Sequence, residues 1–184
     1  MSLLTIWIDA DSMPRRVRDI TARAGIRHAI PVLYVSNRLV DVTVPSPETE
    51  VVNPAAVERV QEIADDGESG WQNGWIANVL VDGTVDTADA LIVRNAVAGD
   101  LVVTRDLPLA EQLVAADVYA MNDGGPLWTW DGIRERRSVR DAALELRMSG
   151  RVDGTGERSY GIREAHRFAE TFDAFLHRRL DSQR

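Results

Sequence analysis

The chain of 184 residues contains neither cysteine nor lysine. Without cysteine it has no disulfides and no thiolate metal ligands, which fits a reducing compartment, so we expect a cytoplasmic protein. No apolar run approaches the roughly 20 residues that a membrane-spanning helix needs. The opening MSLLTIWIDAD lacks the basic region and the long apolar region of a signal peptide. We therefore expect no membrane contact.

Two common ligand-binding and catalytic signatures are also missing. The chain has no Gly-x-Ser-x-Gly nucleophile elbow, so serine hydrolase chemistry has little support. No Gly-x-Gly-x-x-Gly fingerprint follows the first predicted strand, which argues against dinucleotide binding. Hydrophobic residues make up 45% and charged residues 27%, as is ordinary for a soluble globular protein. We expect one domain spanning residues 1–184, long enough to bury a sizeable core.

The net charge of −8 is distributed unevenly. Residues 1–132 carry 9 arginines against 20 acids, whereas residues 133–184 carry 12 arginines against 9 acids. The acidic body argues against avid non-specific binding to nucleic acid, because such binding depends mostly on neutralising phosphates. The basic C-terminal third is a candidate phosphate-facing surface, although a solvated helix face is the simpler explanation of it.

Short apolar segments rich in Val, Ile and Leu predict buried strands at residues 3–8, 29–35, 76–81, 101–104 and 118–121. Helical spacing predicts helices at residues 14–24, 54–64, 87–97, 108–116, 132–148 and 162–180. The first of these begins at a proline and is expected to stop before Gly25. The alternation indicates an α/β fold, a three-layer α/β/α Rossmann-like sandwich with a mostly parallel sheet. The polar, turn-rich stretch 38–74 is expected to be an irregular excursion.

Aspartates follow three of the predicted strands. Asp9 and Asp11 come at the end of the first strand, and Asp106 follows the strand LVVT. Asp86 and Asp89 come after the third strand and open the next helix. In an open parallel sheet the carboxyl ends of the strands meet at one edge, where ligands bind. We therefore expect the five carboxylates to gather at that edge.

Each of these acids has a simple alternative explanation. Aspartate is a favoured helix N-cap, worth about 1 kcal/mol, and Asp11, Asp86 and Asp106 each precede a predicted helix. Asp9 comes too early to cap and should be partly desolvated. Several carboxylates together would raise one another's pKa values, and Mg²⁺ or Mn²⁺ would remove that cost. Such a cluster suits metal-assisted phosphodiester hydrolysis.

Four motifs, IDADSMP, VDTAD, GDLVVTRDLPLA and IRERRSVRDAALELR, resemble the YaiI/YqxD family of largely uncharacterised bacterial proteins. The likeness covers the first 37 residues and residues 83–149, with a weaker echo in the last helix. It implies a divergent PIN/NYN-like domain, a fold whose acidic cluster binds Mg²⁺ or Mn²⁺ in ribonucleases. The chain departs from the family pattern at Met13, where the family has cysteine, and in a longer segment 38–74. The family's Gly-Gly-Pro-rich stretch before the last helix is replaced by GTGERSYGIRE.

The resemblance implies the roles of individual residues. The metal ligands would be Asp9, Asp11, Asp86, Asp89 and Asp106. The catalytic set would be Asp9, Asp11, Asp89, Asp106 and Thr104. The resemblance also implies Ser36 and Asn37 as polar neighbours of the cluster and as contacts to the substrate, expected to be RNA. Apart from the resemblance, three arginines lie next to the acids in the sequence and could bind phosphates bidentately, with solvated surface as the alternative: Arg105, Arg15 and Arg16. Proteins with this fold often dimerise, so a homodimer is a further expectation by analogy.

Three functions remain open at this point. The first is a metal-dependent nuclease. The second is a phosphatase of the haloacid dehalogenase type, because an apolar strand followed by Asp-x-Asp is that superfamily's first motif, with Asp9 as nucleophile and Asp11 as acid/base. The missing lysine argues against it, since arginine substitutes for lysine imperfectly. The third is a non-catalytic PIN-like module that binds metal, nucleic acid or a protein.

Overall fold

The computed structural model describes residues 4–37, 68–72, 76–81, 87–148 and 160–182. In this part of the chain, six strands form one sheet in the order β3-β4-β2-β1-β5-β6. Five strands are parallel: β1 (Ile6–Asp9), β2 (Val32–Ser36), β4 (Ile76–Leu80), β5 (Leu101–Val103) and β6 (Tyr119–Met121). The five predicted strands are confirmed, with shifted ends.

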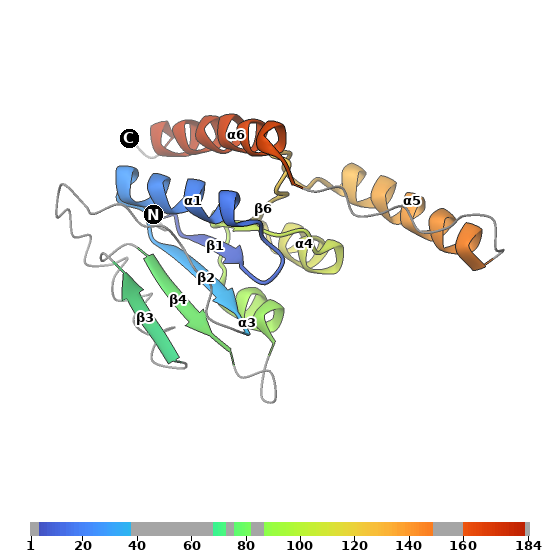
Figure 1. Ribbon diagram of the computed structural model, residues 1–184, viewed down its shortest axis with the longest axis horizontal. Coiled ribbons are helices and arrows are strands. Elements are labelled where there is room, and N and C mark those ends of the chain that lie inside the picture. The colour runs from blue at the N-terminus through green and yellow to red at the C-terminus, as the bar shows by residue number, and fades with distance from the viewer. Residues whose placement is uncertain (1–3, 38–67, 73–75, 82–86, 149–159, 183–184) are drawn as a thin grey trace.

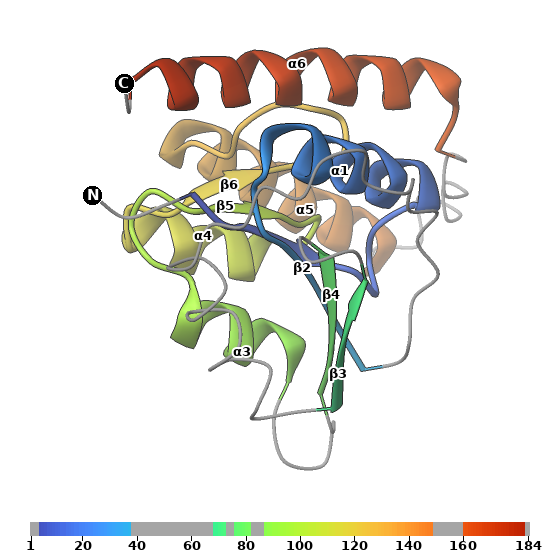
Figure 2. The same cartoon turned by 90° about the vertical axis from the view of Figure 1, so that its left-hand side faces the viewer.

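Helices lie on both faces of this sheet, as Figure 2 shows. They are α1 (Arg15–His28), α3 (Ala88–Asn95), α4 (Leu107–Ala115), α5 (Trp130–Met148) and α6 (Ile162–Asp181). Helices α1 and α6 cover one face, and α3 and α4 cover the other. The predicted three-layer α/β/α sandwich is therefore confirmed, whereas the helix predicted at 54–64 lies outside the described residues. Among the helices described, none is both long and apolar enough to span a bilayer.

The strands are apolar on both faces because both faces are covered. Successive side chains of a strand point to opposite sides of the sheet. Ile6 and Ile8 accordingly pack with Phe172 beneath α1 and α6, while Trp7 packs with Leu109 beneath α4. This double burial explains the continuous Val, Ile and Leu runs that predicted the strands.

The stretch 38–74 is not irregular throughout, as the sequence had led us to expect. Within it, β3 (Glu68–Gln72) pairs antiparallel with β4 and forms the edge of the sheet. An edge strand is held by backbone hydrogen bonds to a single neighbour, and such bonds do not require apolar side chains. The polar sequence ESGWQ therefore lacked the apolar pattern that predicted the buried strands. The other residues of that stretch lie outside those the structure describes.

Helix α1 does not stop before Gly25 but continues to His28. A Cβ atom at Gly25 would lie 2.4 Å from Cγ2 of Val32 and 2.9 Å from the carbonyl oxygen of Ile30. The glycine therefore permits close packing of the helix against the start of β2. The helix ends one turn later, at Ala29, in the left-handed conformation with φ of 52°.

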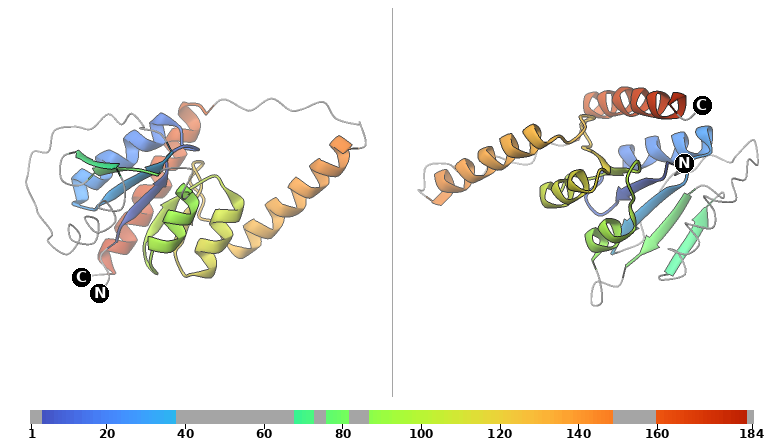
Figure 3. Two further views of the ribbon diagram at one scale, coloured as in Figure 1. Left: turned by 90° about the horizontal axis from the view of Figure 1, so that it is seen from below. Right: turned by 180° about the vertical axis from the view of Figure 1, so that it is seen from behind.

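The strand order reverses at β1. The chain builds β2 and β4 on one side of β1 and then crosses to build β5 and β6 on the other. The carboxyl ends of β1 and β5 therefore flank the topological switch point, where open α/β sheets bind ligands. Helix α5 extends away from the body on this side of the sheet (Figures 1 and 3).

Candidate functional site

Asp9 is the last residue of β1 and is only 5% exposed. Alternation along the strand directs its side chain to the face covered by α3 and α4. Its Oδ2 atom accepts hydrogen bonds from Oγ of Ser12 at 2.6 Å and Oγ1 of Thr104 at 2.8 Å. Because Ile8 pairs with Val103, Thr104 falls beside Asp9 at the ends of the two strands. The register of β1 and β5 thus positions this carboxylate.

Thr104 is fully buried and connects β5 to two neighbouring elements. Its hydroxyl, which donates to Asp9, also accepts from the backbone N–H of Asp106 at 2.9 Å. Its carbonyl oxygen accepts from Nε1 of Trp128 at 3.2 Å. One hydroxyl therefore links the Asp9 carboxylate to the first turn of α4.

Asp106 occupies the N-cap of α4, as its position before Pro108 predicted. Its Oδ1 atom accepts from the backbone N–H of Leu109 at 2.7 Å. The carboxylate still acts on the other acids, because its charge raises the pKa values of Asp9 and Asp89. Capping a helix and belonging to the acidic site are therefore compatible roles for this residue.

Asp89 lies half-buried in the first turn of α3. The prediction that Asp86 caps this helix is wrong, because the N-cap is Thr87, whose hydroxyl accepts from the N–H of Ala90 at 3.1 Å. The helix begins one residue later than expected, which moves the cap from the carboxylate to the hydroxyl. Asp86 itself, a predicted metal ligand, lies outside the described residues.

The carboxylates of Asp9, Asp89 and Asp106 come from three elements and influence one another; we call them the acidic triad. Burial raises the pKa of Asp9, the charges of Asp106 and Asp11 raise it further, and the hydrogen bonds from Ser12 and Thr104 oppose the rise. Burial also raises the pKa of Asp89, and the charges of Asp9 and Asp106 add to the effect. Carboxylates so placed gain from a bound cation.

The acidic triad is not a closed metal cage. Among the described residues, which leave out Asp86, no three acidic or histidine side chains are grouped so that they could hold a metal ion together. The donor chemistry is nevertheless of one kind, since every candidate ligand is a carboxylate oxygen. Oxygen ligands of this kind are those that Mg²⁺ and Mn²⁺ prefer.

Asp11 is exposed and its side chain turns toward the end of β2. Its Oδ2 atom accepts from the backbone N–H of Asn37 at 2.7 Å. The prediction that Asp11 caps α1 is wrong, because the N-cap position is Pro14 and has no side-chain capping bond. Ser36 is buried, and its carbonyl accepts from the N–H of Val81. Asn37 and Ser36 therefore have backbone contacts at the ends of strands.

Two of the predicted phosphate-binding arginines are paired with acids outside the acidic triad. Arg105 donates through Nε at 2.7 Å and through Nη2 to Oδ2 of Asp123, and its Cζ atom lies 5.8 Å from the ring centroid of Tyr160. Nε of Arg15 lies 3.9 Å from Oδ2 of Asp19. Arg16 is exposed. Between described residues, no ion pair joins an arginine to a member of the triad.

Three side chains near the site were not predicted from the sequence. Ser12 donates to Asp9, and Asp123 holds Arg105. The hydroxyl of Tyr160 donates to the Asp123 carbonyl at 2.9 Å, and burial, with the Asp123 charge next, raises its pKa to about 12. Asp123 follows β6, so the strand-end rule could have found it. Tyr160 precedes α6, far along the chain, and had no such signal.

Comparison with known proteins agrees with the motifs. The model of the uncharacterised YaiI/YqxD family matches residues 69–178. The chain belongs to this family. It is 34% identical over 177 residues to a UPF0178 protein of Trichlorobacter lovleyi, covering 96% of both chains. It is 37% identical over 173 residues to the UPF0178 protein BAV3236 of Bordetella avium, covering 94% of both.

The likeness to YaiI/YqxD proteins extends beyond the motifs. A UPF0178 protein of Treponema denticola is 34% identical over 185 residues, covering 98% of this chain and 99% of its own. The segment 38–74, which carries none of the motifs, is therefore spanned by the match as well. No solved structure matches the chain.

Proposed function

We propose that this YaiI/YqxD protein is a Mg²⁺- or Mn²⁺-dependent nuclease that hydrolyses phosphodiester bonds in RNA. The observation that carries the proposal is the acidic triad. Its three carboxylates come from β1, α3 and the N-cap of α4 and lie at the topological switch point. Burial raises the pKa values of Asp9 and Asp89, and the charge of Asp106 raises both further. Perturbed acids gathered in this way are typical of functional sites.

The residues present suit a hard divalent cation. Ser12 and Thr104 both donate to Oδ2 of Asp9, so Oδ1 is the atom of Asp9 that we assign to a ligand. Asp89 and Asp106 are the further proposed ligands and would have to move closer to Asp9 than they lie in this structure. Asp11 and Asp86 complete the proposed set. A divalent ion bound there supplies Lewis acidity that activates water for in-line displacement.

The other residues would act by positioning. The single hydrogen of the Thr104 hydroxyl is committed to Asp9, so Thr104 holds that carboxylate in place rather than transferring a proton. Helices α3 and α4 begin beside the triad, and the positive ends of helix dipoles favour a phosphate. Arg15 and Arg16, on the first turn of α1, are proposed phosphate contacts. Arg105 would have to leave Asp123 to join them.

The proposal is tested by titrating Mn²⁺ calorimetrically into the wild type and Asp9→Asn, followed by an assay on labelled single-stranded RNA. We expect Asp9→Asn to weaken Mn²⁺ binding by at least about tenfold, because even the loss of outer contacts costs this much at metal sites. Cleavage should fall by at least about 100-fold. Asp131→Asn removes the same charge from an exposed position on α5 and should leave both unchanged.

Each alternative function has its own outcome in this experiment. Unchanged Mn²⁺ binding in Asp9→Asn would remove the metal site. Metal binding without cleavage of any RNA or DNA would identify a binding module. Turnover of a small phosphomonoester, with a phosphoryl group trapped on Asp9, would identify a phosphatase of the haloacid dehalogenase type.

A further inference from the structure

Helix α5 is the exposed arm of the molecule. It begins after the loop that leaves β6 at the carboxyl edge, and it extends away from the sheet (Figure 1). Ile133 is buried against the core, but every residue from 134 to 142 is exposed. Val139 has 64% of its surface accessible and Leu144 has 53%. Helix α5 therefore presents a solvent-exposed surface over residues 134–142.

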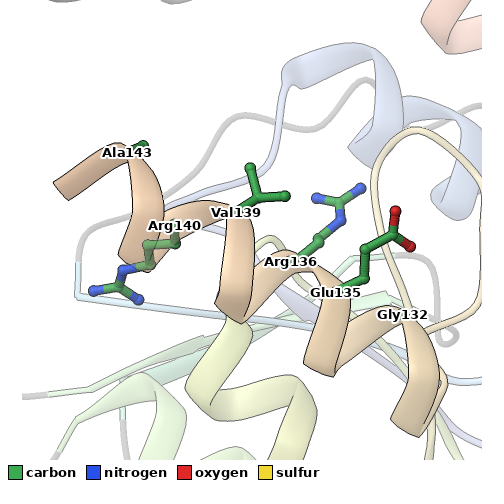
Figure 4. Close-up of a pocket in the computed structure, with 6 residues that line it drawn as sticks. All are labelled: Gly132, Glu135, Arg136, Val139, Arg140 and Ala143. Atoms are coloured by element: carbon green, nitrogen blue, oxygen red, sulfur yellow. The ribbon is translucent and has the colours of Figure 1, made fainter. Parts of the chain in front are cut away.

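One face of α5 borders a surface hollow of about 690 Å³. Its lining residues recur every three or four positions and thus share a helix face: Gly132, Glu135, Arg136, Val139, Arg140 and Ala143. We call this set the α5 stripe. Figure 4 shows Arg136 and Val139 rising from the same side of the helix, with Arg140 leaving its flank.

Arg136 packs against an aromatic ring. Its Cζ atom lies 4.7 Å from the ring centroid of Trp128, which is buried and donates to the carbonyl of Thr104. A contact of this kind orients a guanidinium without neutralising its charge. Because Thr104 also donates to Asp9, only two residues separate Arg136 from the acidic triad.

The four arginines of α5 whose side chains the structure describes fall into two classes. Arg134 is paired with Asp131 on the same helix, and Arg137 is paired with Glu111 of α4. Arg136 and Arg140 have no such carboxylate partner among the residues that the structure describes. Glu135 also borders the hollow, so the lining carries two cations against one anion. The α5 stripe therefore offers positive charge that is connected to the acidic triad through Trp128 and Thr104.

We propose that the α5 stripe binds the phosphate backbone of a single-stranded polynucleotide whose reacting phosphate lies at the acidic triad. This rests on the proposed function and specifies its substrate as a strand of several nucleotides rather than a small phosphate ester. Guanidinium groups bind phosphates in charge-assisted, bidentate pairs, and a flexible single strand can follow the path from the sheet edge onto the arm. An acidic protein would be the competing occupant.

The test is fluorescence anisotropy with a labelled 20-nucleotide RNA, in the Asp9→Asn background so that the strand is not cut. The double variant Arg136→Gln/Arg140→Gln is compared with Arg134→Gln/Arg23→Gln. Arg134 is on the same helix but already paired, and Arg23 is exposed on α1. Loss of two phosphate contacts should lower the slope of log Kd against log salt concentration by about 1.4, and it should raise Kd about 25-fold at 0.1 M salt. The control pair should change Kd by less than about threefold.

The failures of the two proposals can be told apart. Turnover of bis(p-nitrophenyl) phosphate, which is too small to reach the arm, should be unchanged by Arg136→Gln/Arg140→Gln with Asp9 intact. If RNA affinity is also unchanged, or falls equally in the control pair, the role of the α5 stripe is overturned while the nuclease stands. If the wild type cleaves no substrate, but Arg136→Gln/Arg140→Gln lowers RNA affinity and the control pair does not, the RNA-binding role of the α5 stripe is supported and the nuclease proposal is overturned. The role of the α5 stripe is also overturned if the Asp9→Asn parent does not bind the RNA. The same holds if a polyaspartate peptide displaces the RNA as effectively as unlabelled RNA does.

Discussion

Two buried aspartates lie at opposite edges of the same sheet and have very different surroundings. Asp100, directly before β5, is fully buried and accepts from the N–H groups of Thr5 at 3.0 Å and Val97 at 3.1 Å and from Nε1 of Trp7 at 3.1 Å. Asp9, after β1, accepts from two hydroxyls and faces other carboxylates. The difference lies in the partners, since both side chains are nearly inaccessible.

The partners show what each edge of the sheet is built for. At the edge formed by the amino ends of the strands, Asp100 connects β1 to the turn before β5 through three N–H donors. Its charge is therefore stabilised by hydrogen bonds within the protein. At the carboxyl edge, the charge of Asp9 is left with like-charged neighbours, so a ligand that is positively charged can still gain from it. Burial alone would have ranked the two aspartates as equals.

The largest effect on stability is expected from Asp100→Ala. It leaves the buried N–H donors of Thr5 and Trp7 and the part-buried N–H of Val97 without their acceptor. We expect the free energy of unfolding to fall by about 3–5 kcal/mol. Urea denaturation measures this. Asp131→Ala, which removes a surface carboxylate on α5, should cost less than about 0.5 kcal/mol. Equal effects in the two variants would erase the distinction between a buried structural charge and a surface one.

Asp9→Asn should act in the opposite direction. Because the folded-state pKa of Asp9 lies above its ordinary 3.8, ionising it costs stability as the pH rises through that interval. Asparagine keeps an acceptor for Ser12 and Thr104 and should raise the free energy of unfolding at pH 7, without metal, by about 0.5–2 kcal/mol. The gain should shrink toward zero near about pH 3, where Asp9 is protonated in the folded state and mostly protonated in the unfolded state as well.

Urea denaturation at both pH values, in the presence of a chelator, checks this result. Asp11→Asn serves as the control, since it removes the same charge from an exposed position two residues away. Its effect should stay within about 0.5 kcal/mol. A loss of stability in Asp9→Asn at pH 7 would mean that Asp9, like Asp100, is a satisfied structural carboxylate.

Substitutions at Asp106 separate capping from charge and have the smallest expected effect. Asp106→Ala should cost about 1 kcal/mol because it removes the cap on Leu109, whereas Asp106→Asn retains a capping oxygen and should cost little. Both remove the charge that raises the pKa values of Asp9 and Asp89, so both should lower those values. Carboxyl NMR titration measures the shift; unchanged pKa values would show that the triad is not electrically coupled.

The fold was largely predictable because its elements depend on local apolar patterns. The five parallel strands are buried on both faces, so their sequences are almost continuously apolar. The edge strand β3 was missed because it depends on backbone pairing rather than on apolar side chains. Gly25 misled the prediction of α1, since its reason is a tertiary contact with Val32 that no local pattern contains.

The site was predictable as a set of strand ends but not as a set of contacts. Parallel strands bring their carboxyl ends to one edge, so the nearness of Asp9 and Asp106 follows from topology alone. The direction in which each side chain points does not follow from topology. Asp11 turns to the Asn37 amide and Arg105 to Asp123, and both contacts join residues far apart in the chain. The α5 stripe likewise depends on which arginines find carboxylates after folding.

The hydroxyl of Thr104 links two groups of the site in a chain of hydrogen bonds. It accepts from the Asp106 N–H at 2.9 Å and donates to Oδ2 of Asp9 at 2.8 Å. Hydrogen bonds in series polarise one another. A proton or a metal ion that draws electron density from Asp9 therefore changes the Asp106 N–H as well. We therefore expect the NMR signal of the Asp106 amide to shift when Asp9 binds a proton or a metal ion.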